Sequence, residues 1–182
     1  MKLIILALPL LFPAHAFAGT TESTLRYILD DYQAQCVASQ KESMEAVPDG
    51  EDLGAVRIKL DDNSIYEIEI TADGKKATVL YAKPWCPQIG WAWCGSGGCK
   101  SYVIVDGVSF ETSGGKPVSV AVDDKSVVVM VPRAGGACIN TNGQTPSNNV
   151  SCYSVAVWDD YSQTFNSMGS NEPVLKISDF MP

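Results

Sequence analysis

Histidine is almost absent from this 182-residue chain, which contains a single one, His15. His15 lies in an apolar N-terminal stretch with the pattern of a cleaved signal peptide, so we expect the exported chain to contain no imidazole. Imidazole is the usual general base near neutral pH and the commonest metal ligand. Its lack argues against hydrolases with a histidine base and against histidine-ligated metals. We expect no metal and no cofactor.

Basic residues are also few, with 13 Lys and Arg against 21 Asp and Glu. The acidic residues are scattered as short pairs, such as Asp123-Asp124 and Asp159-Asp160, and do not form a tail. Nucleic acids and anionic lipid surfaces bind basic patches. We therefore expect neither a nucleic acid nor an anionic membrane as a partner.

Long hydrophobic runs are missing after the N-terminus. The first eighteen residues, MKLIILALPLLFPAHAFA, contain one Lys, an apolar run and the small-x-small ending Ala16-Phe17-Ala18, which is typical of a secretory signal peptide. No later run approaches the roughly 20 apolar residues of a membrane-spanning helix, so we expect no membrane insertion. We predict a signal peptide over 1–18, a single domain over 19–182, and a periplasmic or secreted protein.

Complete nucleotide, nucleophile and redox motifs are missing too. The segment CGSGGCKS (94–101) places Cys94 and Cys99 where a phosphate-binding loop requires glycine, and Ser96 lacks the first glycine of a nucleophile elbow. The chain contains no C-x-x-C pair, so a thioredoxin-like redox motif is not indicated. The turn at 69–74, EITADG, has too few carboxylates for calcium, and a plain hairpin turn is favoured there.

The periodicity of the other residues predicts a mainly β fold with one N-terminal helix. Apolar residues recur at helical spacing within 20–40, and the polar segment 41–54 is predicted to be a loop. Alternating residues predict strands at 55–60, 65–70, 76–82, 100–105, 108–112, 117–122, 126–132, 151–158 and 162–166. Asp106-Gly107 separates two of these segments, as a two-residue hairpin turn would. We expect an antiparallel meander, a small sandwich or an open barrel, stabilised by disulfides.

The six cysteines of an exported chain are expected to form disulfides, because their spacing lacks the close pairs of a zinc site. Cys94 and Cys99 enclose Gly-Ser-Gly-Gly, whose permissive backbone lets a short loop close, so we pair them. Cys138 and Cys152 flank a polar loop between two predicted strands, where a bridge would clamp a hairpin. Cys36 and Cys86 remain, and a bond between them would tie the helix to the sheet.

Three motifs resemble those of a family of small, uncharacterised secreted proteins of proteobacteria. They are CGSGGC (94–99), VPRAGGACIN (131–140) and SCYSVAVWDD (151–160). In that family a C-G-[ST]-[GA]-G-C knot precedes a β-rich half that ends in a Cys-plus-aromatic strand. The resemblance covers about 86–168 and implies export and a β-rich fold, with no activity attached. Relatives often carry an aspartate-rich turn where this chain has Thr71 and Ala77.

The stretch WCPQIGWAWCGSGGC (85–99) is the best candidate for a binding surface, because Trp85, Trp91 and Trp93 lie between prolines and glycines. Aromatic side chains offer large contact areas at low entropy cost. These rings can present faces to a glycan or an envelope protein. Alternatively, they pack over the disulfides as a small core. Trp158 ends an alternating strand and is expected on a sheet face.

Two functions are compatible with these observations. The first is a non-enzymatic envelope protein that binds or interacts through the aromatic stretch, with an unidentified glycan or envelope protein as its partner. The second is a hydrolase of cell-wall glycan that works through paired carboxylates, since this chemistry needs no histidine. No feature singles out two of the 21 acids, so no catalytic residue is predicted.

Overall fold

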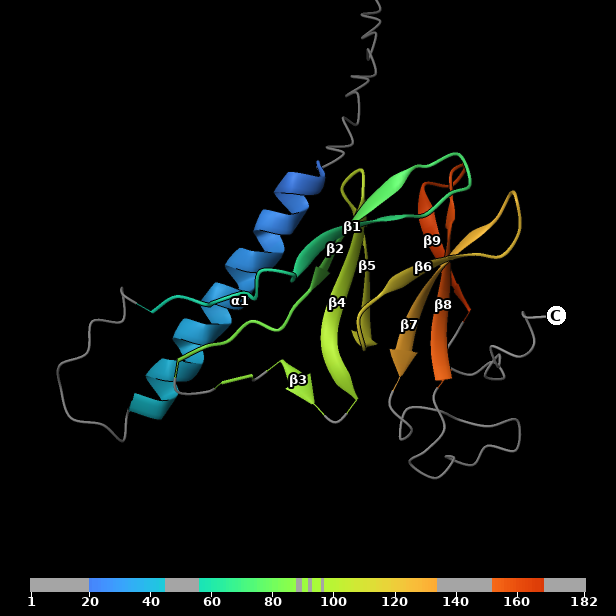
Figure 1. Cartoon of the computed structure of the whole chain (residues 1–182). Helices are drawn as coiled ribbons and strands as arrows, with labels where there is room; N and C mark the ends of the chain where they lie inside the picture. Colours follow the sequence, from blue (N-terminus) through green and yellow to red (C-terminus); the bar gives the residue numbers. More distant parts are fainter. Residues whose placement is uncertain are drawn as a thin grey trace, which may run out of the picture.

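The fold consists of one helix and two antiparallel sheets in three layers (Figure 1). The structure, a computed structural model, describes residues 20–44, 56–87, 90–91, 93–95, 97–133 and 152–168. Helix α1 (Thr21–Met44) covers one face of the first sheet, and the second sheet covers the other. The mainly β fold with an N-terminal helix is confirmed, and its form is an open sandwich.

The first sheet is an antiparallel meander with one short additional strand. It contains β1 (Ile65–Glu69), β2 (Lys76–Tyr81), β3 (Cys94–Gly95), β4 (Gly98–Val105) and β5 (Val108–Gly114). β4 is central, since it pairs with β2, β3 and β5. Cys99 pairs with Cys94 on one edge of β4 and with Gly114 on the other. β3 therefore lies on the same side of β4 as β2, beyond the end of β2.

The second sheet follows the same meander pattern. It contains β6 (Val118–Ala121), β7 (Val127–Arg133), β8 (Cys152–Asp159) and β9 (Thr164–Met168), in that order. Short turns join most neighbouring strands. At Asp106-Gly107, between β4 and β5, φ is 49° and 87°, which is the left-handed backbone that a two-residue hairpin turn requires. The turn predicted there is confirmed.

The central strands of the first sheet are buried on both faces. Because successive side chains of a strand point to opposite faces, Val103 and Val105 pack toward the second sheet while Ile104 packs toward α1. The core between the sheets contains Ile70, Ala77, Val79, Val103, Val105, Val129 and Trp158. The core beneath the helix contains Ile28, Tyr32, Leu80, Ala82 and Ile104. Trp158 thus lies on a sheet face, as expected.

Helix α1 begins at a capping residue and runs further than the sequence pattern predicts. The backbone N–H of Ser23 donates to Thr20 Oγ1 at 3.2 Å, which satisfies one of the free donors of the first turn. The helix continues to Met44, so the prediction of a loop over 41–54 is wrong for 41–44. Lys41 and Glu42 are exposed, and their polarity reflects solvent-facing helical positions. No helix among the described residues is long and apolar enough to cross a bilayer.

The predicted strand at 55–60 is also wrong for its described residues, since Lys59 forms only an isolated bridge with Trp85. The side chain of Gln33 on α1 takes the place of a partner strand. Its Nε2 donates to Val56 O at 2.8 Å and its Oε1 accepts from Ile58 N at 3.0 Å. Ile58 packs against the core beneath the helix. The alternation therefore reflects burial on one side without strand pairing.

Candidate binding site

The three tryptophans of the predicted binding surface have different environments, and Trp93 is partly buried and packs against the core beneath the helix. Its Nε1 donates to Gln35 Oε1 on α1 at 2.7 Å. Its ring meets that of Tyr32 edge to face, with 5.1 Å between the centroids. Both the polar and the apolar parts of this indole contact α1, so Trp93 helps to position the helix.

Trp85 is partly buried and already covered by a cation of the same chain. Its backbone exchanges two hydrogen bonds with Lys59, at 2.8 and 3.0 Å. The ammonium of Lys59 then lies 5.1 Å from the centroid of the Trp85 ring, within the range of a cation–π interaction. A ligand would have to displace Lys59 to reach this face of the indole.

Trp91 differs from the other two because its side chain is open to solvent, with 48% of the residue exposed. It borders an open cleft of about 550 Å³, which we call the Trp91 cleft. The cleft is lined by Asp61, Tyr81, Lys83, Trp91, Cys94, Gly98 and Cys99. This volume is in the range of small-molecule sites. The structure thus brings one of the three predicted tryptophans to a cavity and places the other two elsewhere.

The Trp91 cleft forms where β4 extends beyond the end of β2. Tyr81 is the last residue of β2 and pairs with Ser101, so the start of β4 is left to pair with β3. The Cys94–Cys99 disulfide joins β3 to β4. The backbone of Trp91 is bonded to the start of β3, since Cys94 N donates to Trp91 O at 2.9 Å. The position of the indole therefore depends on β3 and its disulfide.

Aromatic, sulfur and charged groups line the Trp91 cleft. The Nζ of Lys83 lies 5.6 Å from the centroid of the Tyr81 ring, so an ammonium stands beside one aromatic face, and Asp61 supplies a carboxylate. Ser101 is fully buried, and no described group hydrogen-bonds its hydroxyl. It lies on the same sheet face as two lining residues, its cross-strand neighbour Tyr81 and Cys99. An unpaired buried hydroxyl is uncommon and costs free energy.

The cysteines are bonded as expected where both partners are described. Cys36 is bonded to Cys86, with 5.8 Å between the Cα atoms, and Cys94 is bonded to Cys99. The first bond ties α1 to the chain after β2. Cys152 also takes part in a disulfide, and its expected partner, Cys138, lies outside the described residues.

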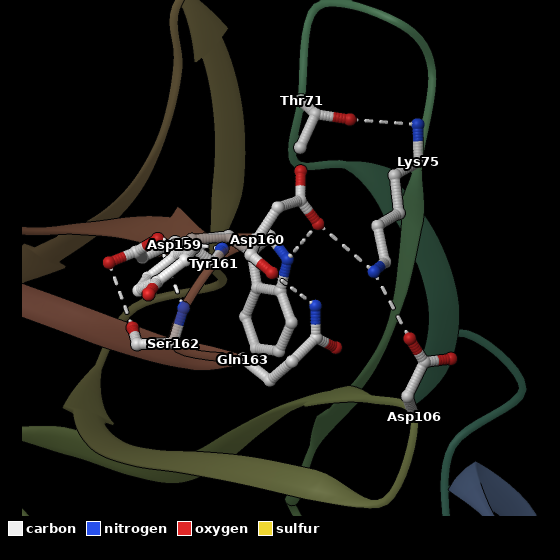
Figure 2. Close-up of polar contacts among 9 residues, drawn as sticks. Thr71, Lys75, Asp106, Asp159, Asp160, Tyr161, Ser162 and Gln163 are labelled. Atoms are coloured by element: carbon white, nitrogen blue, oxygen red, sulfur yellow. Dashed lines mark hydrogen bonds and ion pairs between the residues drawn. The ribbon is translucent and has the colours of Figure 1, made fainter.

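A second polar cluster lies at the hairpin turns of the two sheets (Figure 2). Lys75 Nζ is 3.1 Å from Asp106 Oδ2 and 3.1 Å from Asp160 Oδ1. Trp158 Nε1 donates to the same oxygen of Asp160 at 2.7 Å. The ammonium of Lys75 therefore stands between two carboxylates and balances part of their charge. No described group of three or more Asp, Glu, Cys or His side chains is arranged to hold a metal.

The contacts in this cluster link three turns and shift the pKa values of its members. The hydrogen bond from Trp158 and the ammonium of Lys75 lower the pKa of Asp160. Desolvation opposes the charged form of Lys75, but its contacts with Asp106 and Asp160 outweigh this effect and raise its pKa. We therefore infer that these ion pairs hold the β1–β2, β4–β5 and β8–β9 turns together.

Acid should weaken the contacts that Asp160 makes with Lys75 and Trp158. Because the pKa of Asp160 is lowered in the folded state, its contribution to stability is present above the unfolded pKa, about 4, and is lost as the pH falls through the folded value. We expect Asp160→Asn to reduce the loss of stability as the pH falls below about 4. Urea unfolding at a series of pH values measures this, with the exposed Asp62→Asn as control. Equal acid sensitivity in the two variants would contradict the assignment.

The stretch 85–99 singled out by the sequence contains four of the residues that line the Trp91 cleft, but the sequence did not single out the other three. Asp61, Tyr81 and Lys83 come from two segments that meet only in the fold, since Tyr81 N donates to Ser64 O at 2.8 Å. Tyr81 carries one local signal, because it continues the alternation of Val79 at the end of β2. No local signal marks Asp61 or Lys83 as neighbours of Trp91.

No protein-family model, no curated protein and no solved structure matches the chain. The resemblance to secreted proteobacterial proteins therefore stays a prediction.

Proposed function

We propose that the protein is an exported, non-enzymatic binding module that holds a glycan in the Trp91 cleft. Disulfides are typical of an oxidising, extracytoplasmic compartment, and removal of a signal peptide after Ala18 would deliver the chain to the periplasm or the exterior. The observation that carries the proposal is the half-exposed indole of Trp91 at the edge of a cavity that also contains Tyr81, Lys83 and Asp61.

The lining of the cleft suits a sugar better than a strongly charged ligand. The C–H face of a sugar ring can stack on an indole, and its hydroxyl groups need both donors and acceptors. Lys83 supplies a donor and Asp61 an acceptor, while the aromatic rings and the disulfide form the apolar walls. Sites of this kind are mostly apolar, with a few polar groups that fix the orientation of the ligand.

The hydrolase alternative has less support from the cleft. A glycosidase of the usual kind places two carboxyl groups on either side of the scissile bond. Among the described residues that line the Trp91 cleft, Asp61 is the one carboxylate. Release of soluble fragments from cell-wall glycan by the purified protein would support the hydrolase instead.

Replacing Trp91 should abolish glycan capture and leave the fold intact. We expect Trp91→Ala to weaken binding at least about tenfold, because the stacking surface is lost, with an unchanged melting temperature because this side chain is half exposed. A screen against neutral glycans followed by calorimetry measures the affinity. The matched control is Tyr161→Ala, which removes an aromatic ring that is 98% exposed outside the cleft.

Iodide quenching of tryptophan fluorescence gives a second readout. Trp91 is the most exposed of the four tryptophans, since Trp85 and Trp93 are partly buried and Trp158 is buried in the core. Addition of the glycan should therefore reduce the quenching, and Trp91→Ala should abolish this change. Binding that is equally strong in Trp91→Ala and the Tyr161→Ala control would refute the proposed site.

A further inference from the structure

The described cysteines differ sharply in their access to solvent. Cys36 and Cys86 are 0% exposed, Cys152 is 3% exposed and Cys99 is 4% exposed. Cys94, in contrast, is partly exposed and lines the Trp91 cleft. Thiol–disulfide exchange requires a thiolate to reach one sulfur of the bond. Among the described cysteines, Cys94 is the most exposed, and both Cys94 and Cys99 line the Trp91 cleft, so an external thiolate can approach this bond without unfolding of the core.

Opening the Cys94–Cys99 bond would also disturb little of the sheet. The bond joins residues only 5 apart in sequence, whereas Cys36 and Cys86 are 50 apart, and a small loop gains less chain-entropy stabilisation from closure. β3 contains two residues. After reduction, β4 keeps its pairing with β2 and with β5. The loss of this bond is therefore local to the cleft.

The charges of the Trp91 cleft affect the rate at which a thiolate attacks the Cys94–Cys99 bond. The nucleophile and the leaving group of disulfide exchange are both anionic, so a nearby cation favours the reaction. Lys83 supplies an ammonium on the same lining as Cys94, and Asp61 makes the opposing contribution. Lys83 forms no described salt bridge, and its Nζ lies over the ring of Tyr81. Its charge is thus not neutralised by a described carboxylate.

We propose that Cys94–Cys99 is a thiol–disulfide exchange site, reduced selectively by an extracytoplasmic dithiol protein while Cys36–Cys86 stays oxidised. A thiolate of the partner attacks Cys94 Sγ, the S–S bond breaks, and Cys99 leaves as a thiolate. The second thiolate of the partner then attacks the mixed disulfide and releases Cys94. Two electrons and two protons pass to the Cys94–Cys99 pair, and the partner is left as a disulfide. This site does not depend on glycan binding in the cleft.

Differential alkylation tests the selectivity. The oxidised full chain is incubated with reduced thioredoxin, quenched with acid and alkylated, and the labelled cysteines are identified by peptide mass spectrometry. We expect Cys94 and Cys99 to be labelled at least about tenfold faster than Cys36 and Cys86, because their bond is the accessible one. Near-UV circular dichroism should persist meanwhile. Labelling of all four at one rate, or none before unfolding, would overturn the proposal.

Two further experiments identify the attacked sulfur and the role of Lys83. A thioredoxin variant with its second active-site Cys replaced by Ser should be trapped as a mixed disulfide on Cys94, and trapping on Cys36 or Cys86 would overturn the assignment. Lys83→Met should slow reduction severalfold because it removes the cleft cation. Lys76→Met is the matched control, since Lys76 lies at the opposite end of β2 from Tyr81. Equal rates in the two variants would exclude Lys83 from the site.

Discussion

Removal of the Cys36–Cys86 disulfide should produce the largest loss of stability. The two cysteines are 50 residues apart, and by chain entropy a bond that closes such a loop stabilises the fold by about 4 kcal/mol. Both residues are fully buried, so we expect the Cys36→Ala/Cys86→Ala double variant to lose at least this much. Urea unfolding followed by far-UV circular dichroism gives the free energy of unfolding.

The second disulfide provides the control for this result. Cys94 and Cys99 are 5 residues apart, so the Cys94→Ala/Cys99→Ala variant should lose only about 2 kcal/mol. The first variant should also disturb Trp93, because its indole contacts Tyr32 and Gln35 on the helix that Cys36 anchors. A red shift of fluorescence in the first variant alone is therefore expected. Equal losses in the two variants would show that α1 is held by packing and not by the bond.

Substitution of Gly114 should have the second largest effect. A Cβ added at Gly114 would lie 2.3 Å from the carbonyl oxygen of Pro132 and 2.9 Å from a methyl carbon of Val131. Gly115 N donates to the same oxygen of Pro132 at 2.6 Å, so the two backbones cannot separate without losing this hydrogen bond. We expect Gly114→Ala to lower the free energy of unfolding by about 3 kcal/mol. Thermal unfolding at a fixed scan rate measures the change.

The matched control for Gly114 lies in the same part of the fold. An added Cβ at Gly95 on β3 would meet nothing within 4 Å, so Gly95→Ala should leave the melting temperature nearly unchanged. If both variants melted alike, the close approach of β5 to β7 would be contradicted. The result also bears on the Trp91 cleft, because a Cβ at its lining residue Gly98 would lie 2.1 Å from the carbonyl oxygen of Gly114.

Most of the strands could be predicted because their signals are local. The segment 65–70 alternates apolar and acidic residues, and β1 forms there as a half-exposed strand. Asp106-Gly107 adopts positive φ at both residues, which depends on the residue types themselves. Segment 55–60 shows the same alternation, but the side chain of Gln33 bonds the backbone of Val56 and Ile58, and Lys59 forms only an isolated bridge. Alternation of apolar and polar residues indicates that one side of a segment is buried. It does not show whether the backbone groups of the segment bond to a partner strand or to a side chain.

The candidate site could be predicted only in part. The sequence by itself determined an oxidised, aromatic-rich stretch within a mainly β fold, since cysteine spacing, alternation and turn residues act over a few neighbouring positions. Only the tertiary structure decided that Trp93 packs beneath α1 and that Trp91 opens to a cleft with Tyr81 and Lys83. The physical reason is that the exposure of an indole depends on which distant segments cover it. The residues next to each tryptophan in the sequence do not show which segments these are.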